Sequence, residues 1–335
     1  MSWIDRVLEA FGRQGASEEL AAEYGLSTFC GMSGRQRRQV LLTQAVLRGA
    51  LRSIVESFGE EVPFLLLKGQ PLQEMLYGGR YLRPTGDIDL LVLPGDREEA
   101  RRRILALGYR PKWEEGPRMW VHNQEPFIHV DHGLIVELHW SVAEPQMPQP
   151  AVGSLFESSV EFGLDEDLVV RVLPRDWQLF QVVLHFHHHM GFAKGLVDVA
   201  AWLDSYGADC DEGALVERAR RLGMFGMMQW PLHTMGLLVG ERPPLWDDGA
   251  DRFVRALAAL SARAMRDCLV RRARGEFEAS LVAVMPRVGP ARGVAMRAAS
   301  MVVVDGGVGQ KGVACVRSVV EGPHFLGRML AVQSS

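Results

Sequence analysis

The residues best suited to chemistry are two aspartates at the start of a short apolar run. Residues 88–93 predict a buried strand, and Asp87 and Asp89 stand at its beginning. Side chains alternate between the two faces of a strand, so both carboxylates point the same way, about 7 Å apart. A buried carboxylate without a partner is costly, so the pair requires a cation. Mg²⁺ suits this position because it binds one or two carboxylates together with substrate phosphates.

A second apolar run lies upstream of the aspartates. Residues 64–67 predict another buried strand, which ends at Lys68 and Gly69, and residues 70–77 can form about two turns of helix. A loop rich in Gly, Arg and Pro then leads to Asp87. The two strands are therefore expected to lie in one sheet, with the loop between them close to the aspartates.

The residues of these two strands and of the loop between them resemble those of a known superfamily. Lys68-Gly69, then Arg83, then Asp87-Ile88-Asp89 in a strand resemble the nucleotidyltransferase superfamily of DNA polymerase β type. More narrowly, they resemble the family of uncharacterised nucleotidyltransferases, in which Lys-Gly stands where relatives have Gly-Ser. The superfamily needs a third carboxylate on a later strand, and Glu137 lies in the apolar run LIVELHW. The resemblance extends more weakly to about residue 225, through LPRDW, HFHHH and Asp198.

The resemblance implies roles for the three carboxylates. Asp87 and Asp89 would hold two Mg²⁺ or Mn²⁺ ions about 3.5–4 Å apart, as in two-metal sites. Glu137 would bind the ion on the acceptor side and favour deprotonation of the acceptor. The alternative interpretation makes Asp87 a turn or cap residue and Asp89 a surface carboxylate, but the apolar run after them argues against it.

The nucleotide-binding residues follow from the same resemblance. Lys68 would meet the β- and γ-phosphates as a point charge, and Gly69 would let the backbone approach them. Arg83 could contact phosphate with its planar fork. Thr85 and Gly86 would shape the turn that aims Asp87. Without the neighbouring aspartates, Lys68 would read as an ordinary lysine at a strand end.

The segment HFHHHM offers a second group of candidates. His185 and His189 are four residues apart, so they share a helix face at a spacing that metal sites use. No Cys or acidic residue stands in register beside them, and Asp198 lies one helix away. We therefore expect His185, His189 and Asp198 to line the edge of the active-site cleft, at least one of them within about 10 Å of the aspartates, on the scale of a ligand pocket.

The pattern changes from strand-like to helical along the chain. This predicts an α+β fold, with a polymerase β-like core of mixed sheet and flanking helices followed by a helical domain. The expected divisions are a helical lead-in at 1–60, the catalytic core at 61–150, the helical domain at 151–275 and a segment of uncertain structure at 276–335. The expected helices are 35–58, 97–107, 176–190, 194–206, 211–222, 224–239 and 250–274. The expected strands beyond the aspartates are 109–113, 119–122, 127–131 and 134–140.

Composition narrows the class of protein. The 335 residues are 47% hydrophobic and 23% charged, with a net charge of −4. That balance gives no basic footprint for a long nucleic-acid partner. The four cysteines are far apart in the sequence, which fits a reducing cytoplasm rather than a disulfide framework. The N-terminus does not resemble a signal peptide and no run is long enough to span a bilayer, so a soluble cytoplasmic protein is expected.

Together these features predict a Mg²⁺-dependent nucleotidyltransferase. It would move a nucleoside monophosphate, with AMP from ATP as the favoured case, to a hydroxyl or phosphate of a small-molecule or peptide acceptor, and release pyrophosphate. One alternative is a toxin-like enzyme that modifies tRNA or protein. Another is a nucleotide-binding subunit without turnover, although three retained carboxylates argue against it. The sequence leaves the base, the acceptor and the oligomeric state open.

Overall fold

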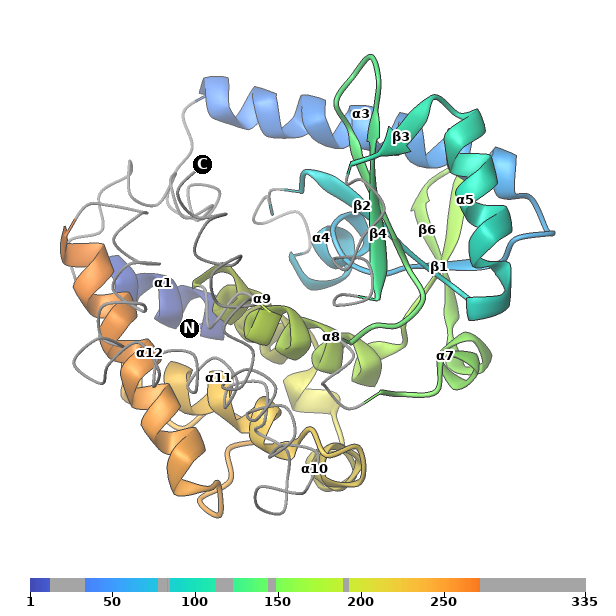
Figure 1. The fold of residues 1–335 in the computed structure, drawn as a ribbon. Coiled ribbons are helices and arrows are strands. Elements are labelled where there is room, and N and C mark those ends of the chain that lie inside the picture. The colour runs from blue at the N-terminus through green and yellow to red at the C-terminus, as the bar shows by residue number, and fades with distance from the viewer. Residues whose placement is uncertain are drawn as a thin grey trace, which may run out of the picture.

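The computed structural model describes residues 1–12, 34–77, 83, 85–112, 123–143, 149–188 and 193–271. The expectations for His189, for the strand at 119–122 and for the segment 276–335 lie outside these residues. Figure 1 shows a strand-rich part and a helical part lying against each other. This arrangement confirms the predicted α+β class.

Seven strands form one mixed sheet in the order β3-β4-β5-β2-β1-β7-β6. β2 occupies the centre, antiparallel to β1 on one side and parallel to β5 on the other. The strands are β1 Phe64–Leu66, β2 Asp87–Val92, β3 Tyr109–Pro111, β4 Gln124–His129, β5 Ile135–His139, β6 Val160–Asp165 and β7 Leu168–Val172. The two strands expected to carry the carboxylates are therefore neighbours.

Helices α3 (Gly34–Phe58) and α5 (Arg97–Ala106) cover one face of the sheet (Figure 1). In the C-terminal half of α3, Leu47, Leu51, Ile54 and Phe58 recur at helical spacing, and all four are fully buried. They pack on the side chains of β2 that alternate with the aspartates, such as Leu90. This face is apolar because it carries the core of the strand-rich part.

The opposite face of β2 changes character along the strand. At its far end, Leu91 packs with Leu155 and Phe156 of the short helix α7 (Val152–Ser158). At its beginning, the same face presents Asp87 and Asp89. The apolar end anchors the strand, and the polar end is left for chemistry.

The sheet continues past residue 150, where the sequence predicts the start of a helical domain. β6 and β7 form a hairpin, and β7 pairs in parallel with β1. Buried and exposed residues alternate along β7, which is the pattern of a half-buried strand. The run of prolines before residue 151 hides this return to strand structure. The division into domains itself stays a prediction.

The helical part has its own apolar core, built from helices of both ends of the described chain. Each expected helix of this part is found to within a few residues. None of the described helices is both long enough and apolar enough to cross a membrane. The helices of the helical part are α1 Trp3–Gly12, α4 Gln70–Tyr77, α8 Arg175–His188, α9 Ala193–Tyr206, α10 Glu212–Arg221, α11 Phe225–Val239 and α12 Arg252–Arg271.

A proline inside α11 explains one histidine of the HFHHHM segment. Pro231 has no N–H, so the carbonyl of Met227 one turn earlier loses its helical hydrogen bond. His187 of α8 lies 3.1 Å from that carbonyl oxygen through Nε2, which must donate the bond. Its ring also packs edge-to-face on Trp230. His187 therefore joins α8 to α11 and repairs a gap in the helix.

We expect His187→Phe to destabilise the fold by about 1–3 kcal/mol, because it leaves a buried carbonyl unpaired. Pro231→Ala restores an N–H that can bond the same carbonyl. In that background the cost of His187→Phe should shrink. Urea unfolding of both single variants and the double variant measures the coupling, and equal costs in the two backgrounds would contradict this role.

Candidate active site

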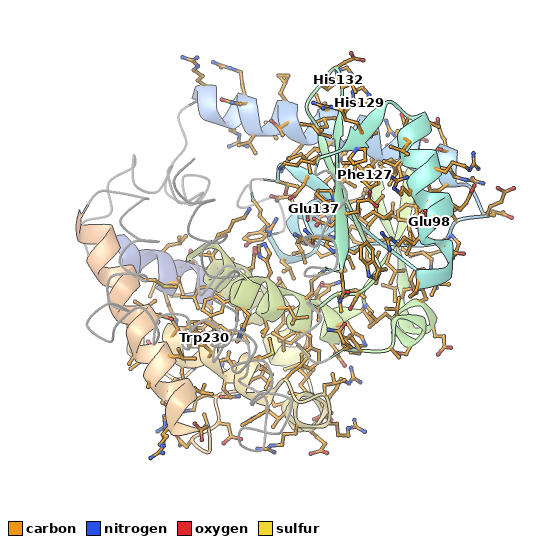
Figure 2. All side chains as sticks on the ribbon, in the orientation of Figure 1. Glu98, Phe127, His129, His132, Glu137 and Trp230 are labelled. Carbon is orange, nitrogen blue, oxygen red and sulfur yellow. The ribbon has the colours of Figure 1, made fainter. Side chains whose placement is uncertain are left out.

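The register between β2 and β5 brings the predicted carboxylates together. Asp89 pairs with Glu137, and Leu91 pairs with His139. Residues opposite one another on neighbouring strands point to the same face, so Asp89, Glu137 and His139 gather on the polar end of that face. In Figure 2, Glu137 lies on the side of the sheet nearer the helical part, and Glu98 lies on the far side.

Asp89 is the centre of this group. Its Oδ1 lies 2.9 Å from Nζ of Lys68 and 3.0 Å from Nε2 of His139. Glu137 Oε2 is farther out, 3.6 Å from His139 Nε2 and 3.9 Å from Lys68 Nζ. The side chain of Asp89 is fully buried, whereas that of Glu137 is 20% exposed. Asp89 thus forms the floor of the site, and Glu137 forms its accessible edge.

These residues fit a metal ion. One ligand atom each of Asp89, Glu137 and His139 lies within 4.8 Å of the others. The second oxygen of Asp89, Oδ2, is buried and has no hydrogen-bond partner. Such an orphaned anionic oxygen is costly unless a cation satisfies it. Asp87 is outside this trio but lies two residues before Asp89 on the same strand face.

Opposite charges hold the group together against the cost of burial. Burial alone would raise the pKa of Asp89, but Lys68 and His139 outweigh it and hold that pKa far below its usual range. Burial would lower the pKa of Lys68, yet the carboxylates of Asp89, Asp87 and Glu137 raise it strongly. At Asp87 both burial and the Asp89 charge raise the pKa. Asp89 is therefore firmly ionised, whereas Asp87 still needs positive charge beside it.

The turn after β1 closely approaches Thr85, two residues before β2 begins. Gly69 has φ +82°, and a Cβ there would lie 2.8 Å from Cγ2 of Thr85. Only glycine fits this conformation without strain. Gly69 and Thr85 are thus in contact, so the turn after β1 supports the turn before Asp87. Their predicted contacts to the nucleotide stay predictions.

Arg83 is tied to the helical part. Its Nε and Nη2 donate to the two oxygens of Asp198 in α9, at 2.7 and 2.8 Å. The hydroxyl of Tyr77 also donates to Asp198. The side chains of Arg83 and Asp198 are almost completely buried, at 3% and 0% exposure. Because Asp198 accepts from two nitrogens of its guanidinium, Arg83 is joined to α9 in this structure.

The backbone of Arg83 is held as firmly as its side chain. Its N–H donates to Oε1 of Gln73 in α4, and its carbonyl accepts from Nε2 of Gln44 in α3 at 3.4 Å. Three helices therefore hold one residue of the loop, four positions before Asp87.

The helical part contributes two further groups. His185 Nδ1 lies 3.9 Å from Oδ2 of Asp198, so it belongs to the same cluster. Lys194 stands one helical turn before Asp198 on α9 and therefore on the same helix face. Burial and the nearby Arg83 lower the pKa of Lys194 to about 8, against the opposing effect of Asp198 and Asp87. The charge of Lys194 thus interacts both with the Arg83–Asp198 ion pair and with Asp87.

Two site residues escaped the sequence interpretation. His139 could have been found, because it lies two residues after Glu137 on one strand and must share its face. Lys194 had no local signal, because only the packing of α9 brings it toward the aspartates. Asp198 and His185 are placed in one cluster with Arg83, and His189 lies outside the described residues.

Comparison with known families now decides the family. A family model described as an uncharacterised nucleotidyltransferase matches residues 34–240. The chain belongs to this family. The match begins at the first residue of α3 and ends just after α11, so it includes the whole sheet and most of the helical part. The curated proteins offer no match to the chain.

Membership of the uncharacterised nucleotidyltransferase family fits the geometry of the site. The predicted family assignment is confirmed, and the family supports a general nucleotidyl-transfer activity. The family implies a nucleotide substrate and a divalent metal, and the Asp89 trio offers a place for that metal. The family resemblance that rested on a few residues thus covers more than half of the chain.

We expect Asp89→Asn to weaken Mn²⁺ binding by at least tenfold, because it removes the buried charge at the centre of the trio. Calorimetric titration with Mn²⁺ measures the loss. Glu125→Gln is the matched control: Glu125 is also a buried carboxylate, but it pairs with Leu138 and so points to the other face of the sheet. Equal losses in both variants would mean that the trio is not the metal site.

We expect Asp198→Asn to lower the free energy of unfolding by about 3–5 kcal/mol, since it leaves the Arg83 guanidinium buried without a counter-charge. Urea unfolding gives the value. Asp165→Asn provides a comparison, because Asp165 pairs with Arg52 at an exposed site, and the loss of an exposed ion pair should change the free energy of unfolding far less. Similar losses of unfolding free energy in the two variants would show that the Arg83–Asp198 pair does not hold the strand-rich part and the helical part together.

Proposed function

We propose that the protein is a Mg²⁺- or Mn²⁺-dependent nucleotidyltransferase. It transfers a nucleoside monophosphate, with AMP from ATP as the favoured case, to a hydroxyl or phosphate of a small-molecule or peptide acceptor. The observation that carries this proposal is the buried, unpaired oxygen of Asp89 beside Glu137 and His139, in a chain of a nucleotidyltransferase family. The net charge of −4 argues against a long polynucleotide as the acceptor.

The trio divides its work by ligand chemistry. Mg²⁺ prefers oxygen ligands, so Asp89 and Glu137 are its natural partners, together with Asp87 on the same strand face. His139 would either donate from Nε2 to Asp89 and fix that carboxylate or bind the ion directly through the same nitrogen. A bound ion would neutralise the phosphates and stabilise the charge that develops during transfer.

The reaction needs positioning more than covalent help. The acceptor oxygen attacks the α-phosphorus and forms a new P–O bond, while the bond to the β-phosphate oxygen breaks and pyrophosphate leaves with its electron pair. The acceptor proton passes to Glu137, which is the most exposed member of the trio and faces an incoming group. Lys68 and His139 keep Asp89 ionised in spite of its burial, through the charge and hydrogen bonds that they place beside it.

Two lysines supply positive charge for the triphosphate. Lys68 neutralises Asp89. With an ion held by the carboxylates, the Lys68 ammonium would be available to the phosphates. Lys194 reaches the same region from α9, where its charge interacts with that of Asp87. Arg83 would support the site indirectly, because its ion pair with Asp198 joins the residues before β2 to α9.

We expect Glu137→Gln to cut turnover by more than a hundredfold while nucleotide binding stays within a few-fold of normal. The change is nearly isosteric, so it removes a proton acceptor and metal ligand without removing bulk. Calorimetry with ATP, with Mg²⁺ and with EDTA, measures binding. Incubation with α-labelled nucleotides and with candidate small molecules, peptides, tRNA and proteins measures transfer.

The control variant for turnover is Glu161→Gln, which removes an exposed carboxylate from β6, a distant strand of the same sheet. Its turnover should match that of the unmodified protein. Near-normal turnover of Glu137→Gln would remove Glu137 from the mechanism. Tight ATP binding that ignores EDTA would contradict the metal dependence.

A further inference from the structure

Gln70 is the first residue of α4, and its amide is buried without any hydrogen bond. The residue is 5% exposed, and neither Oε1 nor Nε2 has a partner. Among the described side chains with a buried unpaired atom, Gln70 alone leaves both a donor and an acceptor vacant. Each vacant group costs the fold free energy that a polar ligand would return. A buried polar side chain with this defect calls for a functional explanation.

The position of Gln70 points to the nucleotide. It follows Lys68 and Gly69 directly, at the turn where the carbonyl of Gly69 accepts the first hydrogen bond of α4 from Gln73 at 3.1 Å. Gln70 and Gln73 are three residues apart and share a face of α4. Gln73 uses that face to hold the N–H of Arg83. Gln70 is therefore on the side of α4 that faces the loop before Asp87.

The sheet order places Gln70 away from the acceptor. β1, which leads to Gln70, lies on one side of β2, and β5 with Glu137 lies on the other. Under the proposed function, Glu137 receives the acceptor, so the β1 side holds the nucleotide. Lys68 on this side is the cation expected to meet its phosphates.

We propose that Gln70 binds a ribose hydroxyl of the nucleotide. This inference rests on the proposed function. Oε1 accepts the hydroxyl hydrogen, and Nε2 donates to the hydroxyl oxygen, so both vacant groups are satisfied at once. An ionised phosphate offers acceptors only and would leave Oε1 unpaired. The edge of a base also offers a donor and an acceptor, but the ribose is the part of a nucleotide nearest to the phosphates.

A cycle between protein and ligand tests the contact. We would measure the affinity of the unmodified protein and of Gln70→Met for ATP, 2′-deoxyATP, 3′-deoxyATP and GTP by calorimetry with Mn²⁺ and no acceptor. Gln70→Met should weaken ATP binding about tenfold, and one deoxy analogue should bind the unmodified protein about tenfold more weakly. The two losses should not add, because they remove the same contact. The ratio of ATP to GTP affinity should be equal in the two proteins.

Stability separates this role from a structural one. Gln70→Met removes an unsatisfied amide, so it should raise the midpoint of urea unfolding even though it weakens nucleotide binding. Gln73→Met is the matched control from the same helix. It leaves the N–H of Arg83 unpaired and should lower the midpoint.

Several outcomes overturn the inference. Unchanged ATP affinity of Gln70→Met, losses that add with the deoxy analogues, or a loss that follows the base instead of the sugar would each exclude the ribose contact. A lower unfolding midpoint of Gln70→Met would make Gln70 a structural residue. If the unmodified protein binds none of the nucleotides, the proposed function fails and this inference fails with it.

Discussion

The burial of Asp89 is the constraint on which the site depends. A fully buried carboxylate is tolerated only if positive charge and hydrogen bonds surround it. Lys68 at the end of β1 and His139 at the end of β5 both approach the same oxygen of Asp89. The neighbouring strands of the central strand thus each supply one compensating group. The other oxygen is buried and has no hydrogen-bond partner, and that vacancy makes the group a candidate metal site.

A second buried ion pair links this site to the helices. Arg83 and Asp198 are 115 residues apart in the chain and meet at a bidentate contact. Tyr77 and His185 border the same carboxylate. The helices therefore contribute to the site by fixing the loop before β2, in addition to any contact with substrate.

Much of the fold followed from local patterns in the sequence. The apolar spacing of α3 and the alternation around Asp87 and Asp89 predicted both a helix and a strand where they occur. Glu137 was named from the family resemblance and its place in an apolar run, and His139 lies two residues later on the same strand. The hairpin of β6 and β7 was missed because prolines precede it, although its alternation is visible in the sequence. Lys194 and the vacancy at Gln70 depend on packing between distant segments, which no local pattern records.

The place of β1 in the sheet has a consequence for how the chain folds. β1 has only three residues, yet it lies between β2 and β7, and β7 ends more than 100 residues later in the chain. Until residues 168–172 have been synthesised, one edge of β1 has no partner, and such an open edge invites pairing with other chains. The sheet therefore cannot be completed during synthesis before the hairpin emerges from the ribosome. A fragment cut at residue 150 would keep all three carboxylates and still expose an aggregation-prone edge beside them.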